Sequence, residues 1–166
     1  MEKPKILMLI GSDSDLSIVE DGVKFLKEIG VPFKVDISSA HRNPEKTVEY
    51  AKKARKNGVE VIVAVAGMAA HLAGVIASHT TLPVIGVPTG GGTLNGIDAL
   101  LSVVQMPKGV PVATVAINAS RNAAILACQI LSIKYDWIKE KLEKMKEDMV
   151  KENNEKSAKL MKSLDK

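Results

Sequence analysis

Short apolar runs recur along the chain between stretches in which apolar residues have a helical spacing. Five of these runs, at 5–10, 32–37, 60–66, 83–87 and 111–117, are rich in Val, Ile and Ala, and Gly, Pro or Asn residues flank them. Runs of this length and composition are typical of β-strands, most of them buried on both faces. The pattern therefore predicts five strands.

The stretches between these runs predict helices. Leu16, Val19 and Leu26 share one helical face, and Gly30 provides a natural end for that helix. Pro44 suits the first turn of the next helix, because its fixed φ is already helical and no hydrogen bond is lost there. In full, helices are expected over about 16–29, 44–57, 69–79, 95–104 and 122–131.

Strands that alternate with helices indicate parallel pairing through right-handed crossovers, which place helices on both faces of one sheet. Only 3% of the residues are aromatic, so aliphatic side chains must fill the core, as suits a parallel sheet. We therefore predict an α/β fold, a three-layer αβα sandwich around a parallel, flavodoxin-like five-stranded sheet. A chain of 166 residues fits a single domain, 1–166.

The last part of the chain differs from the rest because Lys and Glu dominate it. We divide the domain into a core, 1–131, and a long C-terminal helical extension, 132–166. Because an isolated helix of this kind is marginal in water, the extension must pack an apolar stripe. Its apolar positions are Trp137, Ile138, Leu142, Met145, Met149, Leu160 and Met161. Its own domain or a neighbouring subunit could provide the surface.

Composition excludes several classes of protein. The net charge of +4 is not gathered into a basic block with aromatics, so no nucleic acid is expected as a partner. No run approaches the ~20 apolar residues of a membrane span, and no export signal precedes the first strand, so we expect a cytoplasmic protein. Cys128, the only cysteine, lies in an apolar run and is expected to be a small buried hydrophobe.

Ligands of open α/β sheets bind beyond the carboxyl ends of the strands. This rule points to the loops 11–15, 38–44, 67–71 and 88–96, which hold most of the unusual residues. The last loop is rich in Gly and could cradle a phosphate or act as a mobile lid. The sequence has no recognised ligand spacing for a metal and no Ser-His-acid arrangement.

The first loop has the sequence GSDSD. Ser12, Ser14 and Asp15 can cap the following helix, whose free N–H groups attract anions. A carboxylate here suits sugar hydroxyls better than phosphate, whereas the serines suit phosphate. Capping alone would also explain the motif, which is neither a dinucleotide fingerprint nor a P-loop.

The second and third loops each contribute a histidine. In SSAHRNP, His41 can both give and accept protons near neutral pH, and Arg42 can hold a phosphate with two parallel hydrogen bonds. A plain surface loop is the alternative. In AGMAAHLAG, small residues leave room for a ligand beside the backbone, and His71 is the only strongly polar side chain. A core histidine with satisfied hydrogen bonds would have the same pattern.

Six segments in unbroken order resemble one known family. They are GSDSD, SAHRNP, AGMAAHLAG, PVIGVP, LLSVVQMPKGVPVATVAI and NAAILACQIL. Over about residues 5–131 the chain resembles the class I 5-(carboxyamino)imidazole ribonucleotide mutases, also called phosphoribosylaminoimidazole carboxylase catalytic subunits. The resemblance implies an isomerase of de novo purine (IMP) biosynthesis without metal or cofactor. It would move a carboxylate from the exocyclic nitrogen of a ribonucleotide to carbon-4 of its imidazole by decarboxylation and recarboxylation. A homo-octamer is also implied.

The motif match implies residue roles as well. His41 would be the catalytic proton carrier, and His71, also catalytic, would line the base pocket or orient the substrate. The implied substrate-binding residues are Ser12, Ser14, Asp15, Ser39, Arg42, Gly67, Met68, Ala69, Ala70 and Leu72. The chain departs from the family at Met68 and Ala73, where AGGAAHLPG is common, and at 89–92, where TGGG replaces a stretch with Val and Ser.

Two other functions fit parts of the pattern. The class II carboxylase has the same fold and product but takes CO2 and unmodified aminoimidazole ribonucleotide, and SAHR and AAHL favour the mutase. A non-catalytic flavodoxin-like nucleotide-binding or receiver module could hold Mg²⁺ at Asp13 and Asp15. A receiver, however, needs an aspartate at the end of its third strand, where Ala66 and Gly67 stand.

Overall fold

The computed structural model describes residues 3–164 and contains one sheet of five parallel strands. The strand order is β2-β1-β3-β4-β5. The strands are β1 (Ile6–Ile10), β2 (Phe33–Ile37), β3 (Val61–Gly67), β4 (Val84–Thr89) and β5 (Ala113–Thr114). This topology confirms the predicted α/β fold with a flavodoxin-like strand order.

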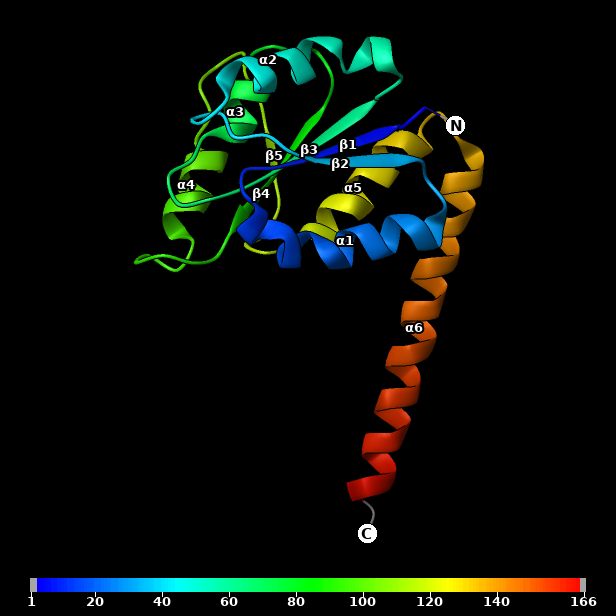
Figure 1. Ribbon diagram of the computed structural model, residues 1–166. Helices are drawn as coiled ribbons and strands as arrows, with labels where there is room; N and C mark the ends of the chain where they lie inside the picture. The colour runs from blue at the N-terminus through cyan, green and yellow to red at the C-terminus, as the bar shows by residue number, and fades with distance from the viewer. Residues whose placement is uncertain (1–2, 165–166) are drawn as a thin grey trace.

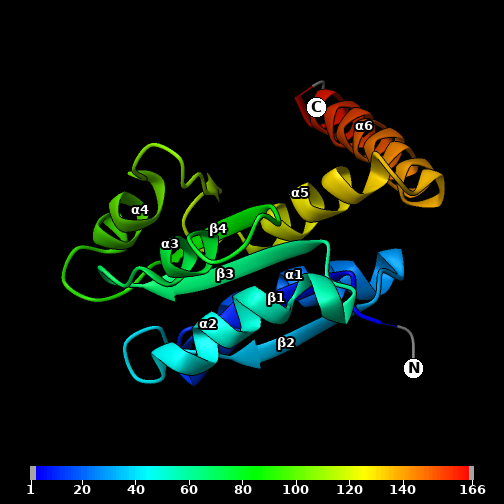
Figure 2. The same cartoon turned by 90° about the horizontal axis from the view of Figure 1, so that it is seen from above.

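Helices cover both faces of the sheet (Figure 1). One layer contains α1 and α5, and the other contains α2 and α3 with α4 beside them, as the view from above also shows (Figure 2). The helices are α1 (Leu16–Ile29), α2 (Pro44–Lys53), α3 (Leu72–Ala77), α4 (Ile97–Val104), α5 (Ser120–Ser132) and α6 (Asp136–Leu164). Two short 3-10 helices, η1 (Asp13–Asp15) and η2 (Arg55–Asn57), precede α1 and follow α2.

The core has two parts because each central strand is buried on both faces. In β1, Ile6, Met8 and Ile10 pack toward α1 and α5. Leu7 and Leu9 of the same strand pack into the opposite layer. Successive side chains of a strand point to opposite faces, so only a continuous apolar run can fill both layers. The apolar runs of the sequence thus reflect burial on two sides.

Cys128 of α5 lies fully inside the first of these layers, as predicted. Burial raises the pKa of its thiol to about 12, because the thiolate would have to lose its hydration.

Three elements are shorter than the sequence pattern predicts. β5 has two residues rather than the run 111–117, because it pairs only with β4 at the edge of the sheet and then turns away, with Asn118 at φ 60°. α2 tightens into the 3-10 turn η2 before Gly58 ends it at φ 93°. α3 begins only at Leu72, because the chain first makes a turn with Met68 at φ 52°.

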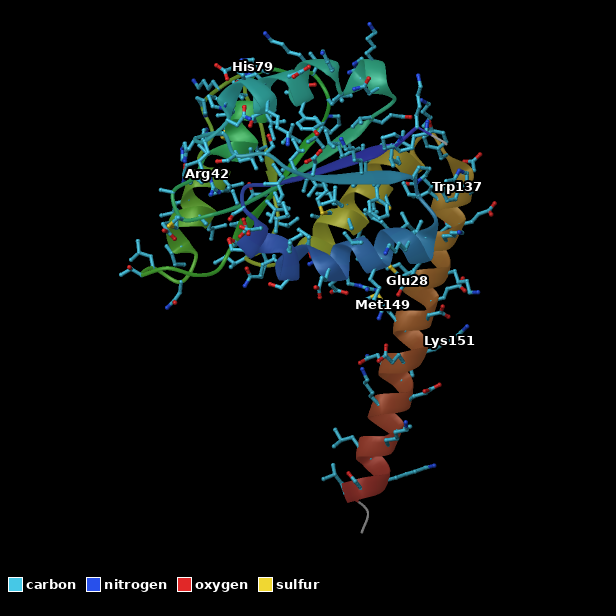
Figure 3. All side chains as sticks on the ribbon, in the orientation of Figure 1. Glu28, Arg42, His79, Trp137, Met149 and Lys151 are labelled. Carbon is cyan, nitrogen blue, oxygen red and sulfur yellow. The ribbon has the colours of Figure 1, made fainter. Side chains whose placement is uncertain are left out.

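The C-terminal helix α6 packs on the core only through its first turns. Ile138 and Leu142 are buried against the layer of α1 and α5, and Met145 packs beside them. Figures 1 and 2 show the rest of α6 leaving the body of the molecule, and Figure 3 places Met149 and Lys151 on that part. The predicted extension is helical from Asp136 to Leu164, after a short turn at 133–135, and its positions 165–166 lie outside the described residues. Between residues 3 and 164, no helix is long and apolar enough to cross a membrane.

Candidate active site

The carboxyl ends of β1 to β4 open into a cavity of about 740 Å³. Arg42 in Figure 3 marks this end of the molecule. The lining residues come from the four loops that the topology predicts and from the elements next to them. They are Gly11, Ser12, Ser14, Asp15, Ser17, Ile18, Ser39, Ala40, His41, Arg42, Ala66, Gly67, Met68, Ala70, Leu72, Thr89, Gly90, Gly91 and Gly92. The cavity thus combines apolar walls with hydroxyls, one imidazole, one guanidinium and one carboxylate.

Ten of the twelve residues predicted for the site line this cavity. They are His41, Ser12, Ser14, Asp15, Ser39, Arg42, Gly67, Met68, Ala70 and Leu72. The two predicted residues that do not line it are His71 and Ala69.

The loop after β1 presents its two aspartates differently. Asp13 is exposed, and hydrogen bonds from the Ser12 hydroxyl and the backbone N–H of Ser14 lower the pKa of its carboxyl. Asp15 is partly buried in the cavity wall, and this burial raises the pKa of its carboxyl. A hydrogen bond from Thr89 and the nearby charge of Arg42 oppose that rise. Asp15 is therefore the carboxylate available to a ligand.

The loop after β2 fixes Arg42 in place. Its Nη2 donates to the carbonyl of Gly11 at 2.9 Å, and its Nε donates to Ser39 Oγ at 3.4 Å. The backbone N–H of Arg42 also donates to Ser39 Oγ, at 3.2 Å. Asn43 then caps α2 by accepting from the N–H of Lys46. These contacts tie the loop to β1 and set the guanidinium beside His41 on the cavity wall.

The loop after β3 forms the apolar side of the cavity. The side chain of Met68 is 66% exposed, and its backbone adopts the left-handed conformation. Gly67 and Ala70 leave space beside the backbone. His71 instead turns toward α4, where its Nδ1 lies 2.9 Å from the carbonyl of Ser102. Because a carbonyl only accepts hydrogen bonds, Nδ1 must carry a proton. The ring also lies over Gly74, where an added Cβ would sit 1.9 Å from Nε2.

Several lining residues were not singled out from the sequence. Ser17, Ile18, Ala40 and Ala66 are neighbours of the motifs, and nothing in their residue type indicates a site. The glycines at 90–92 belong to the loop that was predicted as a cradle or lid. Thr89 lies in the same predicted loop, 88–96, although it was not named as a site residue.

No group of three or more His, Cys, Asp or Glu side chains is placed to hold a metal ion within residues 3–164. The lining side chains can do three things. An imidazole can transfer a proton, a guanidinium can bind an anion, and a carboxylate can accept hydrogen bonds from hydroxyls.

Comparison with known proteins gives the family. Residues 5–152 match the family described as AIR carboxylase. The chain belongs to this family. Its 56% identity over 159 residues with the N5-carboxyaminoimidazole ribonucleotide mutase of Pyrococcus horikoshii covers 96% of this chain and 90% of that protein. The mutase of Thermotoga maritima is 53% identical over 157 residues, which are 95% of this chain and 92% of the relative.

Two further similar proteins extend the comparison. The phosphoribosylaminoimidazole carboxylase of Schizosaccharomyces pombe is 56% identical over 132 residues, which cover 80% of this chain but 24% of the yeast protein. The crystal structure of Treponema denticola PurE superposes with a TM-score of 0.85 at 28% identity, over 95% of this chain and 98% of that one. The family resemblance inferred from the motifs is thus confirmed.

Proposed function

We propose that this protein is the N5-carboxyaminoimidazole ribonucleotide mutase of de novo purine biosynthesis. One observation carries the proposal: His41, Arg42 and Asp15 line a single cavity at the carboxyl ends of the strands. The bacterial and archaeal relatives that are 53–56% identical bear the name of this mutase.

The lining chemistry suggests how the ribonucleotide binds. Arg42 would hold the phosphate together with the hydroxyls of Ser12, Ser14 and Ser39, since a guanidinium and hydroxyls complement its oxygens. Asp15 would accept hydrogen bonds from the ribose hydroxyls. The imidazole base would then lie against the loop after β3, where the lining is Gly67, Met68, Ala70 and Leu72.

His41 would carry one proton through both halves of the reaction. The protonated imidazole gives its proton to the exocyclic nitrogen, the nitrogen–carboxylate bond breaks, and its electron pair returns to nitrogen as CO2 leaves. Carbon-4 of the base then attacks the CO2 to form the new carbon–carbon bond. The neutral imidazole removes the proton from carbon-4, which restores the aromatic ring and regenerates protonated His41.

The cavity must also keep CO2 beside the base, because free CO2 would diffuse away. Holding the two fragments together supplies much of the rate of such a reaction. The small side chains after β3 and the glycines at 90–92 would enclose the CO2. His71 does not line the cavity, and it would act indirectly: its hydrogen bond to the carbonyl of Ser102 would hold the loop after β3 against α4. Ala69 would belong to the same loop on its exposed side.

The substrate assay that tests this function also separates the two carboxylase classes. The purified protein is given either N5-carboxyaminoimidazole ribonucleotide or aminoimidazole ribonucleotide with CO2, and carboxyaminoimidazole ribonucleotide is measured. The mutase predicts rapid turnover of the first substrate. Turnover of only the second pair would assign the class II carboxylase instead, and no turnover of either would contradict both.

We also propose a cytoplasmic homo-octamer in which residues 1–166 form one domain, with a core of 1–131 and an extension of 132–166. A free phosphorylated nucleotide as substrate favours the cytoplasm. Two apolar surfaces support assembly. On and just before α4, Leu94, Ile97, Leu101 and Val104 recur at helical spacing and are exposed. The outer part of α6 exposes Met149, Val150, Leu160, Met161 and Leu164.

A further inference from the structure

Thr89 is a buried hydroxyl in the wall of the candidate site. It is the last residue of β4 and is 4% exposed. Four polar residues are buried in the described part of the chain, namely Ser38, Thr47, Thr89 and Ser120. Among these four, Thr89 alone lines the 740 Å³ cavity. A hydroxyl at such a place needs a partner inside the protein or in the ligand.

The hydrogen-bond partner of Thr89 is Asp15, which follows a strand two positions away in the sheet. Thr89 Oγ1 donates to Asp15 Oδ1 at 3.3 Å. In the sheet, β3 lies between β1, which leads into Asp15, and β4, which ends at Thr89. The hydroxyl can cross this gap because the residue paired with Thr89 on β3 is Gly67. A Cβ at position 67 would lie 2.5 Å from Thr89 Oγ1, so a side chain there would displace the hydroxyl.

We propose that Thr89 is a positioning residue, which holds one carboxylate oxygen of Asp15 so that the other faces the ribonucleotide. This inference rests on the proposed function for its ligand, but the contact itself belongs to the free protein. The hydroxyl favours the ionised carboxylate, because it donates to an oxygen that carries charge only in that form. Burial is the largest influence on Asp15 and opposes the ionised form. A backbone hydrogen bond from Ser12 and the charge of Arg42 also favour the ionised form, whereas the charge of Asp13 opposes it. His41 lines another wall of the same cavity.

Three variants separate the hydroxyl from the shape of the side chain. Thr89→Val removes the hydroxyl at nearly constant volume, and Thr89→Ser keeps the hydroxyl and removes the methyl group. Thr114→Val is the matched control, because Thr114 of β5 donates to the carbonyl of Val103 of α4 and does not line the cavity.

The first measurement uses the free protein and needs no activity. The carboxyl of Asp15 is titrated by carbon-13 NMR in wild type and the three variants. Thr89→Val is expected to raise the pKa of Asp15, because the ionised form loses a hydrogen bond, whereas Thr89→Ser and Thr114→Val leave it near the wild-type value. An unchanged Asp15 titration in Thr89→Val overturns the inference.

The second measurement uses the ribonucleotide. In Thr89→Val, KM should rise by about tenfold while kcat stays within about twofold, and Thr89→Ser should restore KM. The pH at which binding weakens on acidification should also move upward, since Asp15 is protonated earlier. A fall in kcat with unchanged KM contradicts a positioning role. Failure of the wild-type protein to convert either substrate refutes the proposed function, while the NMR titration still decides the contact between Thr89 and Asp15.

Discussion

His41 and Arg42 are neighbours in the sequence, but the structure holds them differently. The guanidinium is fixed by Gly11 and Ser39, whereas no hydrogen bond to the imidazole of His41 is found from residues 3–164. A group that binds an anion gains affinity when its side chain is already fixed, because less side-chain entropy is lost when the anion binds. A group that moves a proton between two atoms of one substrate must instead be free to reorient. The difference matches the two proposed roles.

Replacing His41 with Asn should abolish turnover while ribonucleotide binding is retained. Asn is polar and of similar size but cannot carry a proton, so we expect a loss of about 10²–10⁴ in kcat. Stopped assays and calorimetry with the product nucleotide measure the two quantities. His79→Asn is the control, because His79 is exposed and does not line the cavity. Activity near that of wild type would remove His41 from the mechanism.

Replacing Arg42 with Leu should weaken ribonucleotide binding, by about 10-fold or more, because a charge-assisted pair to phosphate is worth roughly 1.5–3 kcal/mol. Arg42→Lys should bind the ribonucleotide more tightly than Arg42→Leu but less tightly than wild type, since lysine keeps the positive charge but cannot donate two parallel hydrogen bonds to the phosphate. Arg55→Leu is the control, because Arg55 contacts Thr81 and not the cavity. Normal affinity in Arg42→Leu, measured by calorimetry, would refute the phosphate role.

Asp36 should contribute an acid-sensitive part of the stability. Burial acts to raise the pKa of Asp36, but hydrogen bonds from Tyr50, Lys34 and Lys46 outweigh it and lower the pKa from 3.8 to about 2. Because the folded-state pKa is depressed, the stabilisation is present above pH 3.8 and is lost as the pH falls through about 2.

Asp36→Asn should therefore lower the free energy of unfolding at pH 7 by about 1 kcal/mol after solvent screening, and by progressively less as the pH falls through about 2. Chemical unfolding at a series of pH values measures this difference. Asp148→Asn, which breaks an exposed pair on α6, should have no effect at any pH. An equal loss at pH 7 and pH 2 would show that Asp36 acts without its charge.

The sequence was informative about residues that act through local motifs. Asp15, His41 and Arg42 lie in the segments that follow β1 and β2, so the rule that ligands bind at the carboxyl ends of the strands was enough to predict that they share one site. The orientation of His71 was not predictable, because it depends on a carbonyl 31 residues away on α4. The contact of Thr89 with Asp15 was not predictable for a similar reason, since it depends on two distant loops and on the absent side chain of Gly67.

At the scale of elements, helix ends were predictable where the backbone is restricted. Gly30 ends α1 at φ 82°, and Pro44 begins α2. These residue types set the boundary locally, so no tertiary information is needed. The length of β5 was not predictable, because an apolar run says nothing about how many ladder bonds an edge strand makes. Within the run 111–117, only Val112 and Val115 pack against the two core layers, and both are only partly buried.

The two parts of α6 should respond differently to mutation. Leu142 is buried against α1 and α5, so Leu142→Ala should reduce the free energy of unfolding by about 2–4 kcal/mol. Val150 is exposed on the part of α6 that leaves the body, so Val150→Ala should change it by less than about 0.5 kcal/mol in the isolated subunit. Denaturant unfolding at low protein concentration measures both. Equal effects would contradict the division of α6 into a packed and a projecting part.

At the scale of the whole molecule, apolar side chains gather outside the core on and just before α4, beside the site. Leu101 is at the centre of the exposed stripe, so Leu101→Glu should prevent assembly by placing a charge in an apolar contact. Sedimentation analysis should give an octamer for the wild type and a smaller species for the variant. Lys52→Glu on exposed α2 is the control. An unchanged mass in Leu101→Glu would exclude α4 from the subunit contact.

The burial of Cys128 has a practical consequence. Its sulfur is inaccessible and stays a neutral thiol at physiological pH, so the natural sequence behaves toward maleimide reagents as though it had no cysteine. A cysteine placed at the exposed Ser163 would therefore be labelled alone. A single dye at the end of α6 could then report, by energy transfer between differently labelled chains, where each projecting helix lies in the assembled enzyme.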